Sequence, residues 1–342
     1  MQVNKLLKTV SLGACLLSGT ALAAGTSVTG AGSTFIYPVL SKWTTTYAKT
    51  AGVQINYQPI GSGGGIQQLT DKTVTFAASD MPLNIKTLQQ KKWVQFPMVT
   101  GGIVLAIHVQ GIKNNQLTLN GKTLADIYMG KVKYWDNPEI KALNKGVTLP
   151  HNMIVTVHRA DGSGTTFNFT NYLSKVSPAW QKQVGANTVV SWPSFGLGAK
   201  GNAGVAAQVM NTPNTIGYVE YDYAIQNNMA MTKMVNAAGK TVSANLAGFA
   251  SAAKSANWQA SNGFNLILTN QPGAASWPIV ATTFILMPTK GVSPQTVHAT
   301  LSFFKWAFTQ GANTATQLDY VTMPPSVAQT IMAQWASVYN FK

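Results

Sequence analysis

The sequence predicts an α/β protein that folds into two lobes. Segments with strand-like and helix-like periodicity alternate through most of the chain, as in layered α/β folds. A chain of 342 residues is too long to fold around one small hydrophobic core. Two apolar runs far apart in the sequence, Ile103–Val109 and Thr282–Met287, are typical of buried strands. If these strands pair, the chain crosses between two lobes more than once.

The first residues are typical of a signal peptide. Lys5 and Lys8 precede an apolar stretch that ends in the small-x-small cleavage site Ala21-Leu22-Ala23. We therefore assign residues 1–24 to a signal peptide cleaved near Ala23 or Ala24, which predicts export. Cys15, the only cysteine, lies in this segment, and Leu12–Cys15 faintly resembles a lipoprotein box. Lipid anchoring at Cys15 would leave the apolar residues after it, up to Ala24, at the N-terminus with no role. We therefore favour cleavage near Ala23 or Ala24, which gives a mature chain without cysteine.

Two local patterns predict individual elements near the mature N-terminus. The segment Phe35–Tyr47 is expected to be a helix that carries Pro38 in its first turns. Its apolar residues recur at helical spacing, which places Ile36, Val39, Leu40, Trp43 and Tyr47 on one face. The alternation in Val53–Tyr57 predicts a strand.

The positive charge of the chain would attract anions, nucleic acid or an acidic membrane. The formal net charge is +15, and removing Lys5 and Lys8 lowers it to +13. Nucleic acid is excluded as a partner because the lysines are scattered and only one arginine is present. Only nine residues are acidic, and the sequence does not explain this scarcity. One hypothesis is service in an acidic medium, which a stability that is flat from about pH 3 to 7 would support.

One pattern occurs three times: a turn of Gly, Ser and Thr leads into a helix-like segment. The turns are Gly32-Ser33-Thr34, Gly61–Gly65 and Gly162–Thr166. Each helix start offers unpaired N–H donors and a partial positive charge, so three starts directed at one point form an anion site. Ordinary helix capping is the alternative for any single turn.

The only arginine, Arg159, adjoins the third turn. Its guanidinium meets an oxyanion with two parallel hydrogen bonds, which a lysine cannot do. A surface ion pair with Asp161 is the alternative.

Asp80 in Ala78-Ser79-Asp80 is the second informative residue. A carboxylate fits an anion site only when the anion carries a proton, as hydrogen phosphate does and sulfate does not. The alternative is a carboxylate that caps the turn before Pro82.

Enzyme motifs are missing from the sequence. Gly121-Lys122-Thr123 lacks the upstream glycine of a phosphate-binding loop, and neither Ser62 nor Ser163 stands in a Gly-x-Ser-x-Gly elbow. The histidines show no metal-ligand spacing, so we expect neither an enzyme nor a cofactor.

These motifs together resemble the periplasmic phosphate-binding proteins of ABC-type phosphate importers, the PstS family. The resemblance rests on Thr29–Phe35, Ile60–Gly65, Phe76–Asp80, Arg159–Thr165 and Ile216–Tyr221, with Phe96-Pro97 before Gly101-Gly102 and Leu119–Leu124 between them. It runs in order through nearly the whole mature chain.

The resemblance implies a type II-like periplasmic binding protein, monomeric, with phosphate in the cleft between its lobes and an ABC permease as partner. Lobe I would comprise residues 25–105 and 284–342, and lobe II residues 106–283, with hinge strands near Val104–Val109 and Thr283–Met287. The implied phosphate ligands are Thr34, Ser62, Asp80, Arg159, Ser163, Gly164 and Thr165, supported by Asp161, Ser33 and Gly63. A receptor for sulfate, molybdate or tungstate is the alternative.

Overall fold

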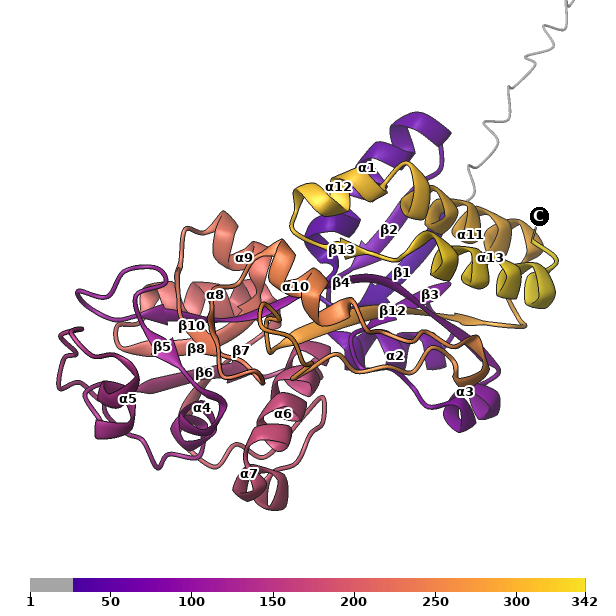
Figure 1. The fold of residues 1–342 in the computed structure, drawn as a ribbon. Coiled ribbons are helices and arrows are strands. Elements are labelled where there is room, and N and C mark those ends of the chain that lie inside the picture. Colours follow the sequence, from indigo (N-terminus) through magenta and orange to yellow (C-terminus); the bar gives the residue numbers. More distant parts are fainter. Residues whose placement is uncertain (1–26, 342) are drawn as a thin grey trace, which may run out of the picture.

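The computed structural model describes residues 27–341, which form one mixed sheet with helices packed against it (Figure 1). The sheet runs, in spatial order, through β2 (Ile55–Gln58), β1 (Val28–Gly32), β3 (Phe76–Ser79), β12 (Val280–Pro288), β4 (Trp93–His108), β8 (Thr215–Glu220), β6 (Val155–Arg159) and β7 (Gly196–Ala199). The short strands β9 (Ala230–Met231) and β13 (Val321–Thr322) also pair with β4. A second small sheet joins β11 (Thr241–Val242), β10 (Lys233–Val235) and β5 (Thr118–Leu119).

Strand β4 divides the sheet into two lobes. Its first part pairs antiparallel with β12 as far as Gly102, and its second part, from Ile103, pairs antiparallel with β8. We call the side with β1, β2 and β3 the first lobe and the side with β6, β7 and β8 the second lobe. Figure 1 shows β4 running from one group of elements to the other. The α/β, two-lobed fold class is therefore confirmed.

The helices divide between the lobes in the same way. Those of the first lobe are α1 (Tyr37–Ala51), α2 (Ser62–Thr70), α3 (Ile85–Lys91), α11 (Pro294–Thr309), α12 (Ala312–Gln317) and α13 (Pro325–Tyr339). Those of the second lobe are α4 (Gly121–Tyr128), α5 (Pro138–Leu143), α6 (Gly164–Val176), α7 (Pro178–Gln183), α8 (Gly201–Asn211) and α9 (Tyr221–Gln226).

Buried tryptophans anchor both lobes and their junction. Trp43 and Trp335 are fully buried in the first lobe, and Trp135 and Trp180 in the second. Trp277 lies at the junction, where its Nε1 donates to Ile103 O across 2.9 Å. This bond satisfies a carbonyl of β4 at the point where that strand changes partner.

The stretch before β12 contacts both lobes. It contains α10 (Leu246–Ala253) and the turn η1 (Ala260–Asn262). Gly263 O accepts from Gln95 Nε2 of the first lobe across 2.7 Å, and Thr269 Oγ1 donates to Asn171 of the second lobe across 2.6 Å. The division at residues 105 and 283 therefore stays a prediction.

The local sequence predictions are confirmed where the structure describes them. The predicted helix is α1, with Pro38 in its first turn and Val39, Leu40, Trp43 and Tyr47 buried along one face. The predicted strand at Val53–Tyr57 is β2, and the two apolar runs lie in β4 and β12. The predicted signal peptide, with Cys15, lies outside the described residues. Among residues 27–341, no helix has both the length and the apolar character needed to cross a membrane.

Candidate functional site

The three polar turns meet where the lobes face each other. Ser33-Thr34 follows β1 and Gly61-Ser62 begins α2, both in the first lobe, whereas Gly162-Ser163 follows β6 and begins α6 in the second. The α2 and α6 turns touch directly, because Gly63 N donates to Gly162 O across 2.8 Å. Gly61 N in turn donates to Gly32 O across 2.8 Å, which joins the α2 turn to the end of β1. The predicted convergence of these turns is confirmed.

Gly61 shows how closely the lobes approach. Its φ is +90°, and a Cβ added there would lie 2.3 Å from Asp161 Oδ2 and 2.7 Å from Gly162 O. Both atoms belong to the second lobe. Glycine is required here by the backbone conformation and by the contact across the junction.

The two carboxylate oxygens of Asp80 have different environments. Oδ1 accepts hydrogen bonds from Ser33 Oγ across 2.6 Å and from Thr283 Oγ1 across 2.7 Å. Oδ2 is buried and has no hydrogen-bond partner among the described residues. A buried carboxylate oxygen without a donor is costly, so this atom marks a place where a ligand donor fits.

Burial raises the pKa of the Asp80 carboxyl to about 6, although the hydrogen bonds from Ser33 and Thr283 and the charge of Arg159 act in the opposite direction. At neutral pH the carboxyl group is therefore mostly ionised, and it can accept a hydrogen bond from a ligand O–H. The turn-capping alternative is wrong, because Ser79 Oγ, and not Asp80, accepts from Met81 N across 3.1 Å.

Arg159 and Asp161 form a buried pair with two hydrogen bonds. Arg159 Nε donates to Asp161 Oδ1 across 2.7 Å, and Nη2 donates to Oδ2 across 2.5 Å. The Arg159 side chain is only 1% exposed, so the alternative of a surface pair is wrong. Burial raises the pKa of the Asp161 carboxyl, but the hydrogen bonds and charge of Arg159 outweigh burial and leave that pKa below its usual value. The carboxylate therefore stays charged and orients the guanidinium.

Part of the guanidinium remains available to a ligand. Besides its bonds to Asp161, Arg159 donates from Nη1 to Thr165 Oγ1 across 3.3 Å. Among the residues that the structure describes, three of the five N–H donors of Arg159 are thus engaged, and one on each terminal nitrogen is left.

The hydroxyl of Ser62 is arranged as a donor. Its oxygen accepts from Asp80 N across 3.2 Å and from Gly164 N across 3.1 Å. A hydroxyl has two acceptor positions and one proton, so the Ser62 proton is left to donate. Ser163 caps α6, because its Oγ accepts from Thr166 N across 3.0 Å, and its proton is likewise left to donate.

Several residues that support the site were not predicted from the sequence. Tyr218 accepts from Arg159 N through its hydroxyl across 3.1 Å. Tyr223 donates from its hydroxyl to Thr34 O across 2.8 Å. Asn202 contacts both Thr34 and Thr165. Tyr218 belongs to the stretch Ile216–Tyr221 that carries the family resemblance, but no local pattern indicates Tyr223 or Asn202, because each reaches the site from a distant part of the chain.

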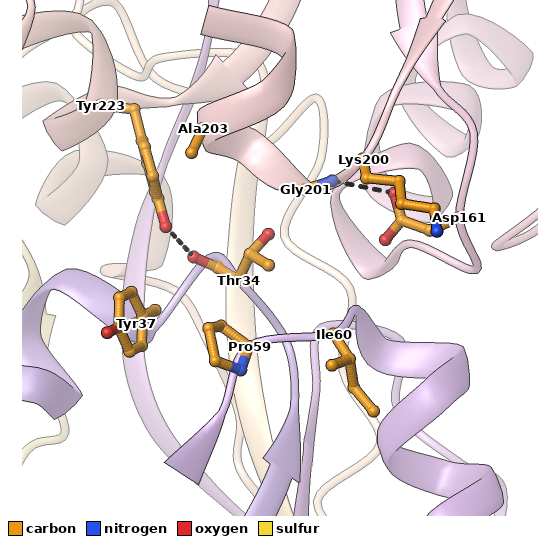
Figure 2. A pocket seen from close by; sticks show the side chains of 9 residues that line it. All are labelled: Thr34, Tyr37, Pro59, Ile60, Asp161, Lys200, Gly201, Ala203 and Tyr223. Atoms are coloured by element: carbon orange, nitrogen blue, oxygen red, sulfur yellow. Dashed lines mark hydrogen bonds between the residues drawn. The ribbon is translucent and has the colours of Figure 1, made fainter. Parts of the chain in front are cut away.

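A pocket opens beside these buried groups (Figure 2). Its wall includes Thr34 and Tyr223 on one side and Asp161, Lys200 and Gly201 on the other. Figure 2 shows the bond from Tyr223 to Thr34 and the bond from Gly201 N to Asp161, the latter 3.0 Å long. Thr34 and Asp161 therefore connect the pocket to the buried polar groups.

Metal ligation has no support in the part of the chain that the structure describes. Among residues 27–341, no group of three or more His, Cys, Asp or Glu side chains is placed to hold a metal ion.

Comparison with known proteins gives consistent matches along the chain. A family model described as a PBP superfamily domain matches residues 19–310. The phosphate-binding protein PstS of Haemophilus influenzae is 49% identical over 309 residues, which cover 90% of this chain and 92% of that protein. PstS of Pasteurella multocida is 48% identical, with 90% of each chain covered. PstS of Methanocaldococcus jannaschii is 34% identical and covers 87% of this chain and 82% of its own.

Solved structures show the same fold at lower identity. A high-affinity periplasmic phosphate-binding protein bound with phosphate matches with a TM-score of 0.73 at 20% identity, covering 90% of this chain and 93% of that one. A phosphate-binding protein from Stenotrophomonas maltophilia matches with a TM-score of 0.71 at 17% identity, covering 91% and 94%.

Proposed function

The chain belongs to the PstS family of phosphate-binding proteins, and from this we propose that it binds inorganic phosphate between its lobes and delivers it to an ABC-type import permease. One observation carries the choice of phosphate. Within residues 27–341, Asp80 Oδ2 is buried without a hydrogen-bond partner, and the Ser62 hydroxyl, which is left to donate, bonds the Asp80 backbone N–H. Hydrogen phosphate supplies both an acceptor oxygen for this hydroxyl and the O–H that the carboxylate needs.

Each contact residue has a distinct role in this proposal. Arg159 gives its two free N–H groups to phosphate oxygens, with Asp161 holding it in place. The hydroxyls of Thr34, Ser62, Ser163 and Thr165 donate to the anion. Gly164, expected as a direct ligand, has its N–H bonded to Ser62 Oγ across 3.1 Å and acts through that hydroxyl. Asp80 Oδ2 accepts a hydrogen bond from the phosphate O–H, and Ser33 holds the carboxylate by donating to Oδ1. Gly63 contributes the backbone bond that joins the two lobes.

The proposed selectivity follows from the proton on the ligand. Sulfate has no proton at neutral pH, so its oxygen would face Asp80 Oδ2 lone pair to lone pair. A site built to accept a ligand O–H rejects an analogue without it by about 10⁴-fold or more. Molybdate and tungstate present the same difficulty, which makes these oxyanions the weaker alternative.

We further propose that phosphate stabilises a closed arrangement of the lobes. The first lobe, residues 25–105 and 284–342, provides Thr34, Ser62 and Asp80, and the second lobe, residues 106–283, provides the remaining ligands. Only an arrangement in which the lobes touch brings both sets to one anion, so binding favours closure. The hinge would lie in the crossing strands, near Val104–Val109 and Thr283–Met287.

The remaining parts of the proposal concern the whole protein. Cleavage of residues 1–24 near Ala23 or Ala24 would release a periplasmic monomer that binds substrate without altering it. The permease is the expected partner of the closed form.

Titration calorimetry of the phosphate-stripped protein tests this function. We expect tight one-to-one binding of phosphate and no heat with sulfate, molybdate or tungstate at neutral pH. Hydrolysis of a chromogenic phosphate ester is measured in parallel, and turnover would contradict a purely binding role. Preference for sulfate over phosphate would refute the role given to Asp80.

A further inference from the structure

Asn202 is fully buried at the start of α8 and uses all of its side-chain polar groups. Its Nδ2 donates to Thr34 Oγ1 across 2.8 Å and to Thr165 Oγ1 across 3.3 Å. Its backbone N–H also donates to Thr34 Oγ1, across 3.2 Å. Asn202 therefore joins a threonine of the first lobe to a threonine of the second.

The orientation of the Asn202 amide is determined by its surroundings. Glu220 N donates to Asn202 Oδ1 across 3.0 Å. A backbone N–H is only a donor, so the side-chain atom that faces it must be the oxygen. The amide nitrogen is thereby directed at the two threonine hydroxyls.

This orientation decides which way each threonine hydroxyl points. Thr34 Oγ1 accepts two bonds, both from Asn202, and Thr165 Oγ1 accepts one from Asn202 and one from Arg159 Nη1. Two accepted bonds occupy both acceptor positions of a hydroxyl and leave only its proton. Neither threonine can then act as an acceptor toward a ligand.

We propose that Asn202 is a positioning residue for anion binding. It commits the hydroxyls of Thr34 and Thr165 to donate to the anion, and it links the two lobes around that anion. The inference rests on the proposed phosphate-binding function and adds a residue that acts on the ligand through two others. The backbone N–H groups of Asp80 and Gly164 occupy the Ser62 oxygen in the same way, so the arrangement recurs within the site.

Two substitutions of Asn202 test the proposal by calorimetry and by phosphate dissociation rate. Asn202→Ala removes the side-chain bonds to both hydroxyls, and we expect phosphate affinity to fall about tenfold to a hundredfold, mainly through faster dissociation. Asn202→Asp keeps the shape of the side chain but replaces the Nδ2 donor with a carboxylate oxygen. The hydroxyl protons of Thr34 and Thr165 would then point at this oxygen and no longer at the anion. We expect the aspartate variant to lose more phosphate affinity than the alanine variant. It also allows the proposal to be tested if the alanine variant fails to fold.

A matched control separates positioning from structural support. Asn144 is also a buried asparagine of the second lobe, and its side chain bonds the backbone at Thr118 and Ile140. We expect Asn144→Ala to lower the unfolding temperature without changing phosphate affinity.

A double-mutant cycle with Thr34→Val decides whether Asn202 acts through the threonine. In the Thr34→Val background, Asn202→Ala should cost clearly less affinity than in the wild type, because one hydroxyl that it positions is absent. Fully additive losses, or Asn202 variants within about threefold of the wild type, would overturn the inference while leaving the proposed function intact. If the wild type itself binds no phosphate, the proposed function fails first and this inference fails with it.

Discussion

Replacing Asp80 with asparagine is expected to weaken phosphate binding and to admit sulfate. The structure determines how the new side chain sits. Ser33 and Thr283 both donate to Oδ1, so the amide oxygen must occupy that position. The amide nitrogen then replaces Oδ2 and faces the ligand as a donor.

The magnitude follows from the contacts exchanged at that one atom. Phosphate loses a hydrogen bond from its O–H to a charged acceptor, worth about 1.5–3 kcal/mol, so its affinity should fall roughly tenfold to a hundredfold. For sulfate, the substitution replaces a repulsive lone pair and negative charge of the protein with an N–H donor. The preference for phosphate should therefore shrink from about 10⁴ to roughly 10² or less.

Calorimetry with both anions at neutral pH measures this change in preference. Asp71→Asn is a suitable control, because Asp71 is an exposed carboxylate of the same lobe whose side chain, within residues 27–341, accepts only from Gln67. That control should bind both anions as the wild type does. If Asp80→Asn keeps the wild-type preference for phosphate over sulfate, Asp80 does not sense the proton and the reasoning is refuted.

Three further predictions concern the guanidinium, the approach of the lobes and pH. Arg159→Lys should weaken phosphate binding by about a hundredfold or more in calorimetry. An ammonium group lacks the planar set of donors with which a guanidinium bonds Asp161 and the anion at the same time. Retained affinity would contradict this. Gly164→Ala should weaken phosphate binding without lowering the ligand-free unfolding temperature, because its Cβ would lie 2.5 Å and 2.7 Å from atoms of the opposite lobe. Gly204→Ala is the control: its Cβ would lie 3.6 Å from the nearest atom, so it should change neither phosphate binding nor the unfolding temperature. Burial raises the pKa of the Glu220 carboxyl well above its usual range, so the stability that this group contributes at low pH is lost as pH rises through its folded pKa. Urea unfolding should then show a more stable protein at about pH 5 than at about pH 8, in contrast to the flat stability expected from the scarcity of acidic residues. Glu220→Gln should reduce this margin, and His158, whose pKa burial lowers, partly offsets it; the reverse slope would refute this.

The elements that the sequence predicts well depend on local patterns. Helix α1 follows from apolar spacing, and the start of α6 follows from a capping serine. Strand β4 was predicted only from Ile103, although it begins at Trp93. Pro97 and Gly101-Gly102 are unusual inside a strand, which is why the periodicity does not reveal it. Pro97 lies opposite Phe284, where the pairing register of β12 shifts, and such an irregularity accommodates a residue without an N–H.

The parts of the site that the sequence does not reveal depend on long-range contacts. Asn202 lies 168 residues from Thr34, and Thr283 lies 203 residues from Asp80. Neither residue belongs to a motif, and an asparagine or threonine at a buried position has many ordinary explanations. The sequence identifies Asp80 as an unusual carboxylate, but only the fold shows that one of its oxygens is satisfied and the other is not.

The groups proposed to hold phosphate carry little positive charge among them. Arg159 is paired with Asp161, and Asp80 adds a second carboxylate, so these buried side chains are together formally negative. Attraction at contact must then come from oriented dipoles, and the hydroxyl oxygens of Thr34, Ser62 and Thr165 are each occupied so that only the proton remains. Donors fixed in advance need no reorientation when the anion arrives. The surplus of lysines acts at longer range, where it can steer an anion but cannot sense a proton on it. Under the proposed function, selection among tetrahedral oxyanions therefore depends on the buried dipoles and on Asp80, whichever charges the surface carries.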